Sequence, residues 1–439
     1  MRLGLGALAA VTAFVAAFAV AGALWVPSRD GPVTNPLDFR AFYCAGAALG
    51  AGADPYRVEP LRACERSTLA SAGLTMDPRR VVPAPLPPYA LLAFAALARL
   101  PYRVASQAWF ALTLLALSAS IWLVAMLARL RPLPVAAALF AALGTASLAY
   151  GQVVPLAVAG LALAALAARE RNGPLAAAGC CIAALEPHLA LPVWLGLALL
   201  APATRRSLAV AGTLLAALSL AAGAGLNLEY VREVLPLHAR SEIMEFGGQY
   251  GLPSLLWTLG TPIPAALAAG SLCYAVMLTL GLAIARGVVV RTGDAAFAVT
   301  IPAAAVLLGG PFLHDHQLAA ALPLGLMLAG SVPAGSRAWT AAVMAVVLLA
   351  IPWQSLAEFS AGVDRLPPRA VGAAPADPPP ARADQLAEVP YTAFVDAFAD
   401  RDDRRTRFEQ TLWKMPTWLA LIALCGLAVR FEGRRRVRI

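Results

Sequence analysis

Long apolar runs alternate with short polar intervals along most of this chain. A run over residues 3–26 follows Arg2, and further runs lie near 103–128, 133–149, 152–168, 174–190, 191–204, 207–226, 263–287, 294–310, 316–332, 338–353 and 414–430. The first run is longer than the roughly 7–15 apolar residues of a signal peptide, so we interpret it as a span. The pattern predicts an all-α polytopic membrane protein, a bundle of about 12 transmembrane helices that each need about 20 apolar residues. The run at 191–204 is shorter than that length.

Composition agrees with this fold class and excludes a water-soluble globule. The chain is 60% hydrophobic and 13% charged, whereas soluble domains carry roughly 25% charged residues. The net charge of +9 comes almost wholly from arginine. These arginines gather at the ends of apolar runs, as expected for cytoplasmic ends under the positive-inside rule, at 129/131, 169/171, 205/206, 286/291, 337 and 434–436. This placement predicts that both termini are cytoplasmic, and it argues against nucleic-acid binding.

Residues 86–100 are apolar but too short for an ordinary span. If they crossed the membrane, every later arginine cluster would face outside. We therefore interpret them as a re-entrant or juxtamembrane helix. The alternative, that they cross and that another run is miscounted, stays open.

With this topology, the polar intervals share the outer face. They are 28–85, 150–152, 227–250, 309–317 and 354–413. We predict three parts: a main transmembrane domain at 1–355, an outer segment at 356–413, and a final helix with a basic tail at 414–439. The outer segment is first Pro-rich, which is typical of a flexible linker, and then amphipathic.

Cysteine usage indicates no metal framework. Cys44 and Cys64 both fall in the first outer loop, where an oxidising compartment permits a disulfide. Two unpaired small residues are an equal alternative.

Asp38 lies about a dozen residues past the first apolar run, close to Arg40 and Tyr43. A carboxylate at the membrane boundary can serve as a general base that takes a proton from an attacking hydroxyl. It can equally cap a helix that begins near Phe39. The two roles are compatible, and the sequence favours neither.

His314, Asp315 and His316 follow a Gly-Gly-Pro break between two apolar runs. Ionisable groups that enter a membrane helix are costly and are therefore usually functional. Contact with a phosphate or substrate is the preferred interpretation, a solvated loop is close behind, and a metal site is the least favoured.

Other candidate substrate-binding groups stand at further breaks in the apolar pattern. Glu186 and His188 flank Pro187, and the alternative to substrate binding is that they simply mark an interfacial helix end. Gln152 lies either at a cavity or in a simple turn. In the fourth outer loop, Arg232, His238 and Arg240 could bind an anionic phosphate. A solvated loop face is the more probable role for those three.

Taken together, these motifs resemble the polytopic GT-C glycosyltransferases. They are the early acidic residue Asp38, the Asp-Pro-Tyr sequence at 54–56, Pro87-Pro88-Tyr89 at the start of a helix, Gly151-Gln152 between two helices, and the outer histidine before a late helix. The pattern is most similar to glycosyltransferase family 87, which includes polyprenol-phosphate-mannose-dependent α-mannosyltransferases of bacterial envelopes. The resemblance runs over about residues 1–355, and 356–413 cannot be aligned.

This resemblance implies a GT-C-like bundle and a hexosyltransferase, with inverting sugar transfer on the outer face of a bacterial inner membrane. It implies a polyprenyl-phosphate-linked sugar donor, a glycan or glycolipid acceptor, and no nucleotide, metal or other cofactor. Asp38 aligns with the family's base, and His314 or His316 with its late histidine near the donor phosphate. Relatives commonly carry a lysine where this chain has Glu186, which puts the donor contact there in question.

Two other classes of protein remain as alternatives. A transporter or flippase for a lipid-linked or anionic solute would place ionisable groups near mid-membrane and often has inverted repeats. Here the ionisable groups crowd one face and no repeat is visible, so this alternative is less favoured. An assembly scaffold without chemistry would need no cavity around Asp38.

Overall fold

The computed structural model describes residues 36–71, 81–244, 249–351, 353, 382–399, 408 and 411–431. All regular elements in these ranges are helices, as predicted. The predicted first span at 3–26, the Pro-rich linker and the basic tail lie outside the described residues.

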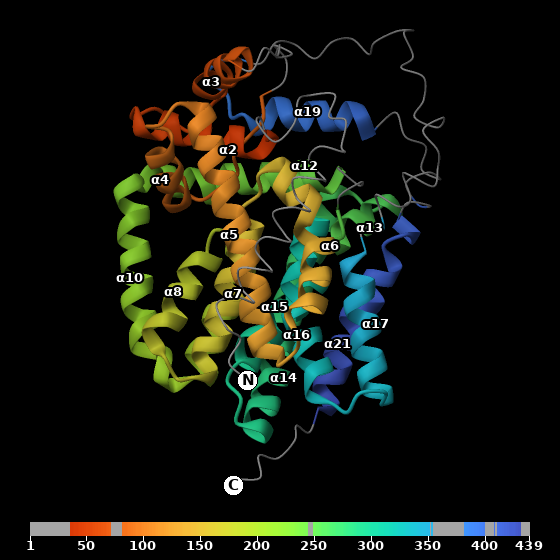
Figure 1. Ribbon diagram of the computed structural model, residues 1–439. Coiled ribbons are helices and arrows are strands. Elements are labelled where there is room, and N and C mark those ends of the chain that lie inside the picture. The colour runs from red at the N-terminus through yellow and green to blue at the C-terminus, as the bar shows by residue number, and fades with distance from the viewer. Residues whose placement is uncertain are drawn as a thin grey trace.

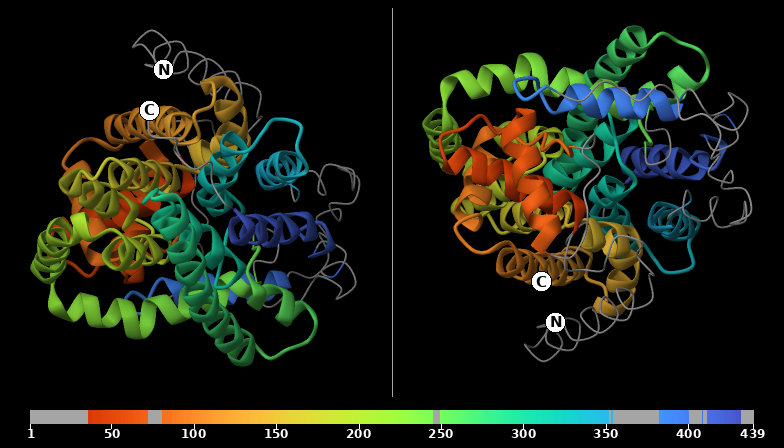
Figure 2. Two further views of the ribbon diagram at one scale, coloured as in Figure 1. Left: turned by 90° about the horizontal axis from the view of Figure 1, so that it is seen from below. Right: turned by 90° about the horizontal axis from the view of Figure 1, so that it is seen from above.

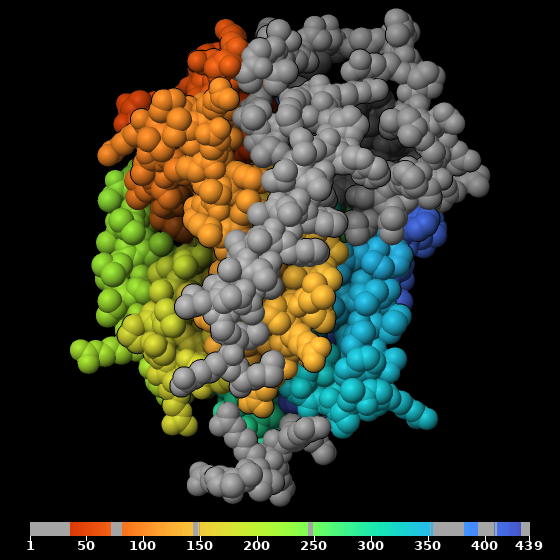
Figure 3. Space-filling view, viewed as in Figure 1, coloured from red at the N-terminus to blue at the C-terminus, as the bar shows by residue number. Residues whose placement is uncertain are grey.

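Most of the apolar runs form a bundle whose helices run roughly parallel to one another (Figure 1). They are α5 (Tyr102–Ala128), α6 (Pro132–Tyr150), α7 (Val154–Arg169), α8 (Gly173–Ala183), α9 (Pro187–Leu200), α10 (Arg205–Ala222), α14 (Ile263–Thr292), α15 (Phe297–Ala305), α16 (Leu322–Ser331), α17 (Arg337–Ala350) and α21 (Met415–Arg430). Short 3-10 segments join or extend them at Pro202–Thr204, Val306–Leu308 and Asp315–Ala321. In Figure 3, α10 and α17 form opposite edges of one face of this bundle.

A second group of helices, which we call the cap layer, covers the upper end of the bundle in Figure 1. It comprises α2 (Leu37–Gly50), α3 (Val58–Ser71), α4 (Pro88–Leu97), α11 (Ala224–Glu229), the π-helical turn Tyr230–Val234, α12 (Leu235–Met244), α13 (Leu252–Thr258) and α19 (Glu388–Ala399). Seen from above, α19 lies along α12 (Figure 2), and the two helices are in contact. The predicted polar intervals thus meet at one end of the molecule.

The arginine-rich helix ends gather at the opposite end of the bundle. Arg169 forms an ion pair with Asp294, with 3.0 Å between Nε and Oδ1, and its Nη1 donates to the carbonyl of Leu127 at 2.8 Å. Arg291 donates through Nε to the carbonyl of Phe431 at 3.3 Å. These contacts hold the ends of four helices together through basic side chains, which explains why the arginines stand at run ends.

Only some bundle helices are long enough to cross a membrane. Three described segments have the length and apolar character of a span: Tyr102–Ala128, Pro202–Ala222 and Ile263–Thr292. The prediction of about 12 full spans is therefore not confirmed. At 1.5 Å per residue, α14 is about 45 Å long, whereas α8 is about 16 Å and α15 about 14 Å. We call the region where the polar turns that follow α8 and α15 meet the cap layer the recess; Glu186 and Gln317 lie there, and His314 contacts Glu242 of α12.

The predicted boundary between the runs 174–190 and 191–204 is wrong. The helix break falls at Ala184–Glu186, and α9 begins at Pro187. Proline disfavours helical backbone in the residue before it and suits the first turn of a new helix. Glu186 therefore stands in a tight turn between two short helices, not near the outer end of a full span.

Within residues 86–100 the chain forms the short helix α4, and the re-entrant or juxtamembrane interpretation of this segment stays a prediction. The ten residues of α4 span about 15 Å, half the thickness of a bilayer core. It packs closely on α2, because a Cβ at Gly46 would lie 2.3 Å from the carbonyl carbon of Phe94. Phe39 of α2 adds a ring stack with Trp109 of α5, at 5.6 Å between centroids.

The C-terminal outer segment folds back on the first outer loop. Val58 donates its N–H to the carbonyl of Gln385 at 3.0 Å, and Ala387 donates to the carbonyl of Tyr56 at 2.8 Å. This backbone pairing precedes α19 and directs that helix along α12. The segment therefore contributes to the cap layer.

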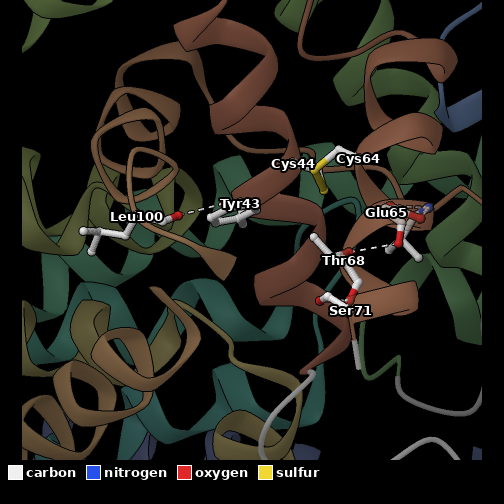
Figure 4. The surroundings of a disulfide bond; sticks show 8 residues. Tyr43, Cys44, Cys64, Glu65, Thr68, Ser71 and Leu100 are labelled. Atoms are coloured by element: carbon white, nitrogen blue, oxygen red, sulfur yellow. Dashed lines mark hydrogen bonds between the residues drawn. A yellow bond between two sulfur atoms is a disulfide. The ribbon is translucent and has the colours of Figure 1, made fainter. Parts of the chain in front are cut away.

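Cys44 and Cys64 form a disulfide that joins α2 to α3 (Figure 4). Of the two alternatives left open by the sequence, pairing is the one observed. The bridge closes a loop of 20 residues. Beside it, the Tyr43 hydroxyl donates to the carbonyl of Leu100 at 2.9 Å, which fixes α2 to the end of α4.

We expect the double substitution Cys44→Ala/Cys64→Ala to destabilise the protein by about 3 kcal/mol, the chain-entropy value for a loop of this size. Thermal unfolding with and without reductant measures the effect. Wild type should lose stability on reduction, and the double variant should not respond. Cys181→Ala, which removes an unpaired cysteine, is the control; equal losses in both variants would contradict the prediction.

Candidate functional site

Asp38 points into the recess from the first turn of α2. The residue that precedes this helix is Pro36, with extended backbone, and no side chain caps the helix start. The interpretation of Asp38 as a helix cap is therefore wrong, because the helix begins one residue before it. Instead its Oδ2 accepts a hydrogen bond from Nε2 of Gln152, 114 residues away in sequence, at 2.5 Å.

Gly151 allows Gln152 to reach Asp38. It has a φ of +74°, a left-handed conformation that favours glycine. A Cβ at this position would lie 2.7 Å from Cβ of Phe39. Its carbonyl also accepts a hydrogen bond from the Trp109 indole at 2.8 Å. The glycine turn therefore fits directly against α2 and presents the Gln152 amide to the carboxylate.

The environment of Asp38 makes it a weaker acid than usual. Loss of solvent raises its pKa to about 6, and this outweighs the nearby His314 charge and the Gln152 hydrogen bond, which both lower it. A carboxylate with such a pKa binds a proton readily near neutral pH while remaining largely ionised there. This is the property required of a general base.

His314 faces the same recess from the loop between α15 and α16. Its Nε2 lies 2.8 Å from Oε2 of Glu242 on α12. Gln249 donates to that same oxygen at 2.5 Å and contacts both ring nitrogens of His314, at 3.1 and 3.3 Å. Burial alone would raise the pKa of Glu242, but the His314 and His238 charges outweigh burial and hold it at about 2. The Glu242 carboxyl group is therefore ionised beside His314.

His238 extends this cluster on the other side of Glu242. Its Nε2 lies 3.5 Å from Oε1 of Glu242, one helical turn away. Its Nδ1 lies 3.4 Å from Oε2 of Glu388 on α19. Burial would lower the pKa of His238, but Glu388 and Glu242 together raise it. A row of alternating acidic and basic groups thus runs from α19 into the recess.

Glu186 and His188 form the third side, at the tip of the short helical hairpin α8–α9. Nδ1 of His188 lies 3.5 Å from Oε2 of Glu186, and that oxygen accepts from Nε2 of Gln317 at 3.2 Å. The Phe312 ring contacts both His188 and His238 edge-on, at 5.6 and 5.2 Å. All four histidines of the chain therefore gather here, the fourth being His316.

Asp315 and His316 complete the loop around His314. Asp315 Oδ1 accepts from the backbone N–H of His316 at 2.6 Å and lies 3.1 Å from its Nδ1. The His316 ring stacks on that of His314, with centroids 5.2 Å apart. Backbone N–H of His314 donates to Oε1 of Gln317 at 2.9 Å. The Gly-Gly-Pro break therefore ends in a rigid turn that orients His314.

Lys414, the single lysine of the chain, binds the main chain of Gln249. Its ammonium donates to the Gln249 carbonyl and lies 5.5 Å from the ring centre of Tyr250. The Trp418 indole donates to the carbonyl of Tyr250 at 2.8 Å. Burial lowers the pKa of Lys414 to about 7. The start of α21 thus holds the two-residue segment that carries Gln249.

Three of the predicted substrate-binding residues lie away from this cluster, whereas Arg40 is close enough to Asp38 for its charge to act on that carboxylate. Tyr43 packs in the α2–α5 aromatic contacts with its hydroxyl on Leu100. Arg40 is buried, and its charge acts on both Glu65 of α3 and Asp38. Arg232 and Arg240 are exposed, whereas His238 is buried. A helix places residues two or five positions apart on different faces, so Tyr43 need not share the site with Asp38, nor Arg240 with His238.

A metal centre was the least favoured interpretation of the His314 loop. Within the described residues, no group of three or more His, Cys, Asp or Glu side chains has an arrangement that could hold a metal ion. The close acid–histidine contacts are ion pairs and hydrogen bonds.

Comparison with known families places this geometry in context. The family model described as glycosyltransferase family 87 matches residues 86–312, just over half of the chain. The chain belongs to glycosyltransferase family 87. No curated protein and no solved structure matches it. The resemblance predicted from the motifs is confirmed, over a shorter stretch than the 1–355 expected.

Membership of family 87 makes the protein a membrane glycosyltransferase, an enzyme with a sugar donor and an acceptor. The transporter alternative has no support. The matched residues include Gln152, Glu186, His188 and Glu242, whereas Asp38 and His314 lie on either side of the match. The recess therefore joins residues inside the family match to groups from both flanking segments.

Sequence reasoning missed several residues of the site, namely Glu242, Gln249, Gln317, Glu388 and Lys414. A usable signal existed for Glu242, because His238 and Glu242 are four residues apart and so share a helix face. Lys414 was visible as the only lysine. The partners of Glu388 and Gln317 were not foreseeable, since they come from distant elements.

We expect Gly151→Ala to destabilise the protein by about 1–3 kcal/mol and to lower glycosyl transfer, because the new methyl group would push Gln152 and α2 apart. Thermal unfolding and transfer rate measure the two effects. Gly52→Ala is a matched control, with a φ of +73° and no atom within 4 Å of the added Cβ. If both variants lost equal stability, backbone strain alone would explain the result.

Proposed function

We propose that this protein is an inverting hexosyltransferase that uses a polyprenyl-phosphate-linked sugar, with mannose as the first choice. The acceptor is a glycan or glycolipid of the bacterial cell envelope. The arginine-rich end of the bundle faces the cytoplasm, and the recess opens on the outer side of the inner membrane. This orientation follows from the positive-inside rule.

One observation carries the proposal: a carboxylate of raised pKa, Asp38, lies close enough to a histidine, His314, for the His314 charge to act on it, at the place where the cap layer meets the bundle. The recess combines a base with a cationic group, the two functions needed to activate an acceptor and to release a phosphate. The site stands at the tips of short helices within an apolar bundle, a position that suits a lipid-linked donor.

In the proposed step, an acceptor hydroxyl attacks the anomeric carbon as Asp38 takes the hydroxyl proton. The new carbon–oxygen bond forms while the bond from that carbon to the phosphate oxygen breaks. The electron pair leaves with polyprenyl phosphate, and attack from the opposite side inverts the anomeric centre. His314 stabilises the leaving phosphate by its charge, and the uncharged His188 ring from the neighbouring turn donates a hydrogen bond to it. No nucleotide or metal ion takes part in the proposal.

Glu186 has a positioning role in this scheme. Its carboxylate holds His188 and Gln317, so it acts on the donor side through these partners. A direct contact between Glu186 and a phosphate would be repulsive. The acidic residue at this position, where relatives commonly carry lysine, therefore leaves phosphate contact to the histidines.

We expect Asp38→Asn to reduce transfer about 10²–10⁴-fold, the usual contribution of a general base. The measurement is transfer of radiolabelled sugar from polyprenyl-phosphate-mannose to membrane acceptors by the purified, folded enzyme. Asp384→Asn, which changes an exposed carboxylate of the cap layer, should retain wild-type rates. Full activity of Asp38→Asn would exclude Asp38 as the base, and transfer only from another polyprenyl-phosphate sugar would correct the donor.

The proposed base also predicts a pH dependence. Asp38 must be ionised to accept a proton, so transfer should fall as the pH drops through about 6. The Gln152 hydrogen bond lowers the pKa of Asp38, so Gln152→Leu should raise it and move the acidic limb of the kcat/KM profile to higher pH. An unchanged limb in Gln152→Leu would show that another group sets it.

A further inference from the structure

Two residues that lie outside the family match, Glu388 and Lys414, contact central residues of the candidate site. Glu388 begins α19 and Lys414 precedes α21, whereas the match ends at 312. Each is 2% exposed despite its charge. Burying a charge is costly unless a partner compensates it, so the contacts of these two residues indicate why they are there.

The first contact links Glu388 to His238. Both carboxylate oxygens of Glu388 and Nδ1 of His238 are buried without a hydrogen bond, and the two groups lie 3.4 Å apart. A charge on either group is therefore compensated mainly by the other, and the His238 charge offsets part of the burial that raises the pKa of Glu388. His238 in turn contacts Glu242, which holds His314.

The second contact links Lys414 to Gln249. The ammonium donates to the main-chain carbonyl of Gln249, whose side-chain amide bonds Glu242 and contacts His314. The Gln249 Oε1 accepts from the N–H of Leu313, next to His314. Both arms from the C-terminal part of the chain therefore end at the same pair, Glu242 and His314.

We propose that Glu388 and Lys414 are positioning residues of the transfer site, which fix the Glu242–His314 pair through His238 and Gln249. The proposal rests on the proposed function only for the identity of the step that His314 serves. Its physical content is that the C-terminal part of the chain sets the charge and orientation of two histidines in the recess.

The charge argument concerns His238. The titratable groups that face it are Glu388 from α19, Glu242 from its own helix, His314 from the α15–α16 loop and Glu186 from the α8–α9 turn. Glu388 is the strongest of the influences that raise its pKa. With Glu388→Gln, His238 should lose its proton at lower pH than in wild type, by roughly one unit, as expected for loss of one close opposite charge.

The chain has only four histidines, which allows a direct test. The intact protein, labelled with ¹³C-histidine in detergent micelles, gives four imidazole signals that His→Gln variants assign. We expect the His238 titration midpoint to fall by roughly one pH unit in Glu388→Gln and to be largely restored in Glu388→Asp. Asp384→Asn, in the same segment but exposed, should leave it unchanged.

Lys414→Met removes the ammonium and keeps a side chain of similar shape. The His314 signal should then shift, because the segment that carries Gln249 loses its anchor, while the His238 midpoint stays near the wild-type value. An unmoved His238 midpoint in Glu388→Gln, or an unmoved His314 signal in Lys414→Met, would overturn the corresponding arm of the proposal.

Transfer kinetics separate this inference from the proposed function. If the His238 charge supports transfer, the alkaline limb of the kcat/KM profile should move to lower pH in Glu388→Gln. For a shift of one pH unit, kcat/KM at pH values above that limb should be about tenfold lower than in wild type. Activity near the optimum should remain. A uniform loss at every pH would reveal a merely structural role and overturn the proposal. Altered histidine signals without transfer from any polyprenyl-phosphate sugar would refute the proposed function and leave the positioning role intact.

Discussion

The Glu242–His314 pair is the interaction on which the recess depends. The Glu242 side chain is 3% exposed and that of His314 is 23% exposed, so isolating the buried Glu242 charge would cost several kcal/mol. Their 2.8 Å contact, with Gln249 on both, offsets that cost. His238 contacts Glu242 through one ring nitrogen and Glu388 through the other. Each buried charge in the row is thus compensated by the next group, and the row ends at Glu388 of α19 in the cap layer.

Helix length determines where this polar row can exist. The short helices α8, α9, α15 and α16 leave room above their tips, and their turns carry the polar residues that full spans could not accommodate. Long apolar helices pack against these short ones, α5 on α16 and α14 on α9 and α15. Burial at this place raises the pKa of Asp38 to about 6, although the charges of His314 and Arg40 and the Gln152 hydrogen bond lower it.

The cap layer closes the recess by contacts that join distant parts of the chain. A disulfide and the tight α2–α4 packing fix Asp38 from one side. The backbone pairing of residues 385–387 with 56–58 directs α19 along α12 from the other. Asp38 and the Glu242–His314 pair therefore reside on separately anchored elements, which brings side chains from distant parts of the chain to one place.

The sequence by itself determined the helical class, most helix positions, the shared end of the arginines, and the polar breaks that hold Asp38, Gln152, Glu186, His188 and His314. These follow from local rules: apolar length, proline and glycine punctuation, and the cost of charge in an apolar run. The predicted boundary between the runs 174–190 and 191–204 lies a few residues after the observed helix break at Glu186, because an apolar run does not show which proline begins a helix.

Only the tertiary structure decided which polar residues meet. Lys414 binds Gln249 across 165 residues, and Gln152 binds Asp38 across 114. Tyr43 is near Asp38 in sequence yet packs among aromatic rings of α2 and α5, because a helix sends neighbouring side chains to different faces. A local pattern can show that a buried charge needs a partner. The identity of that partner depends on long-range packing, which a short stretch of sequence does not specify.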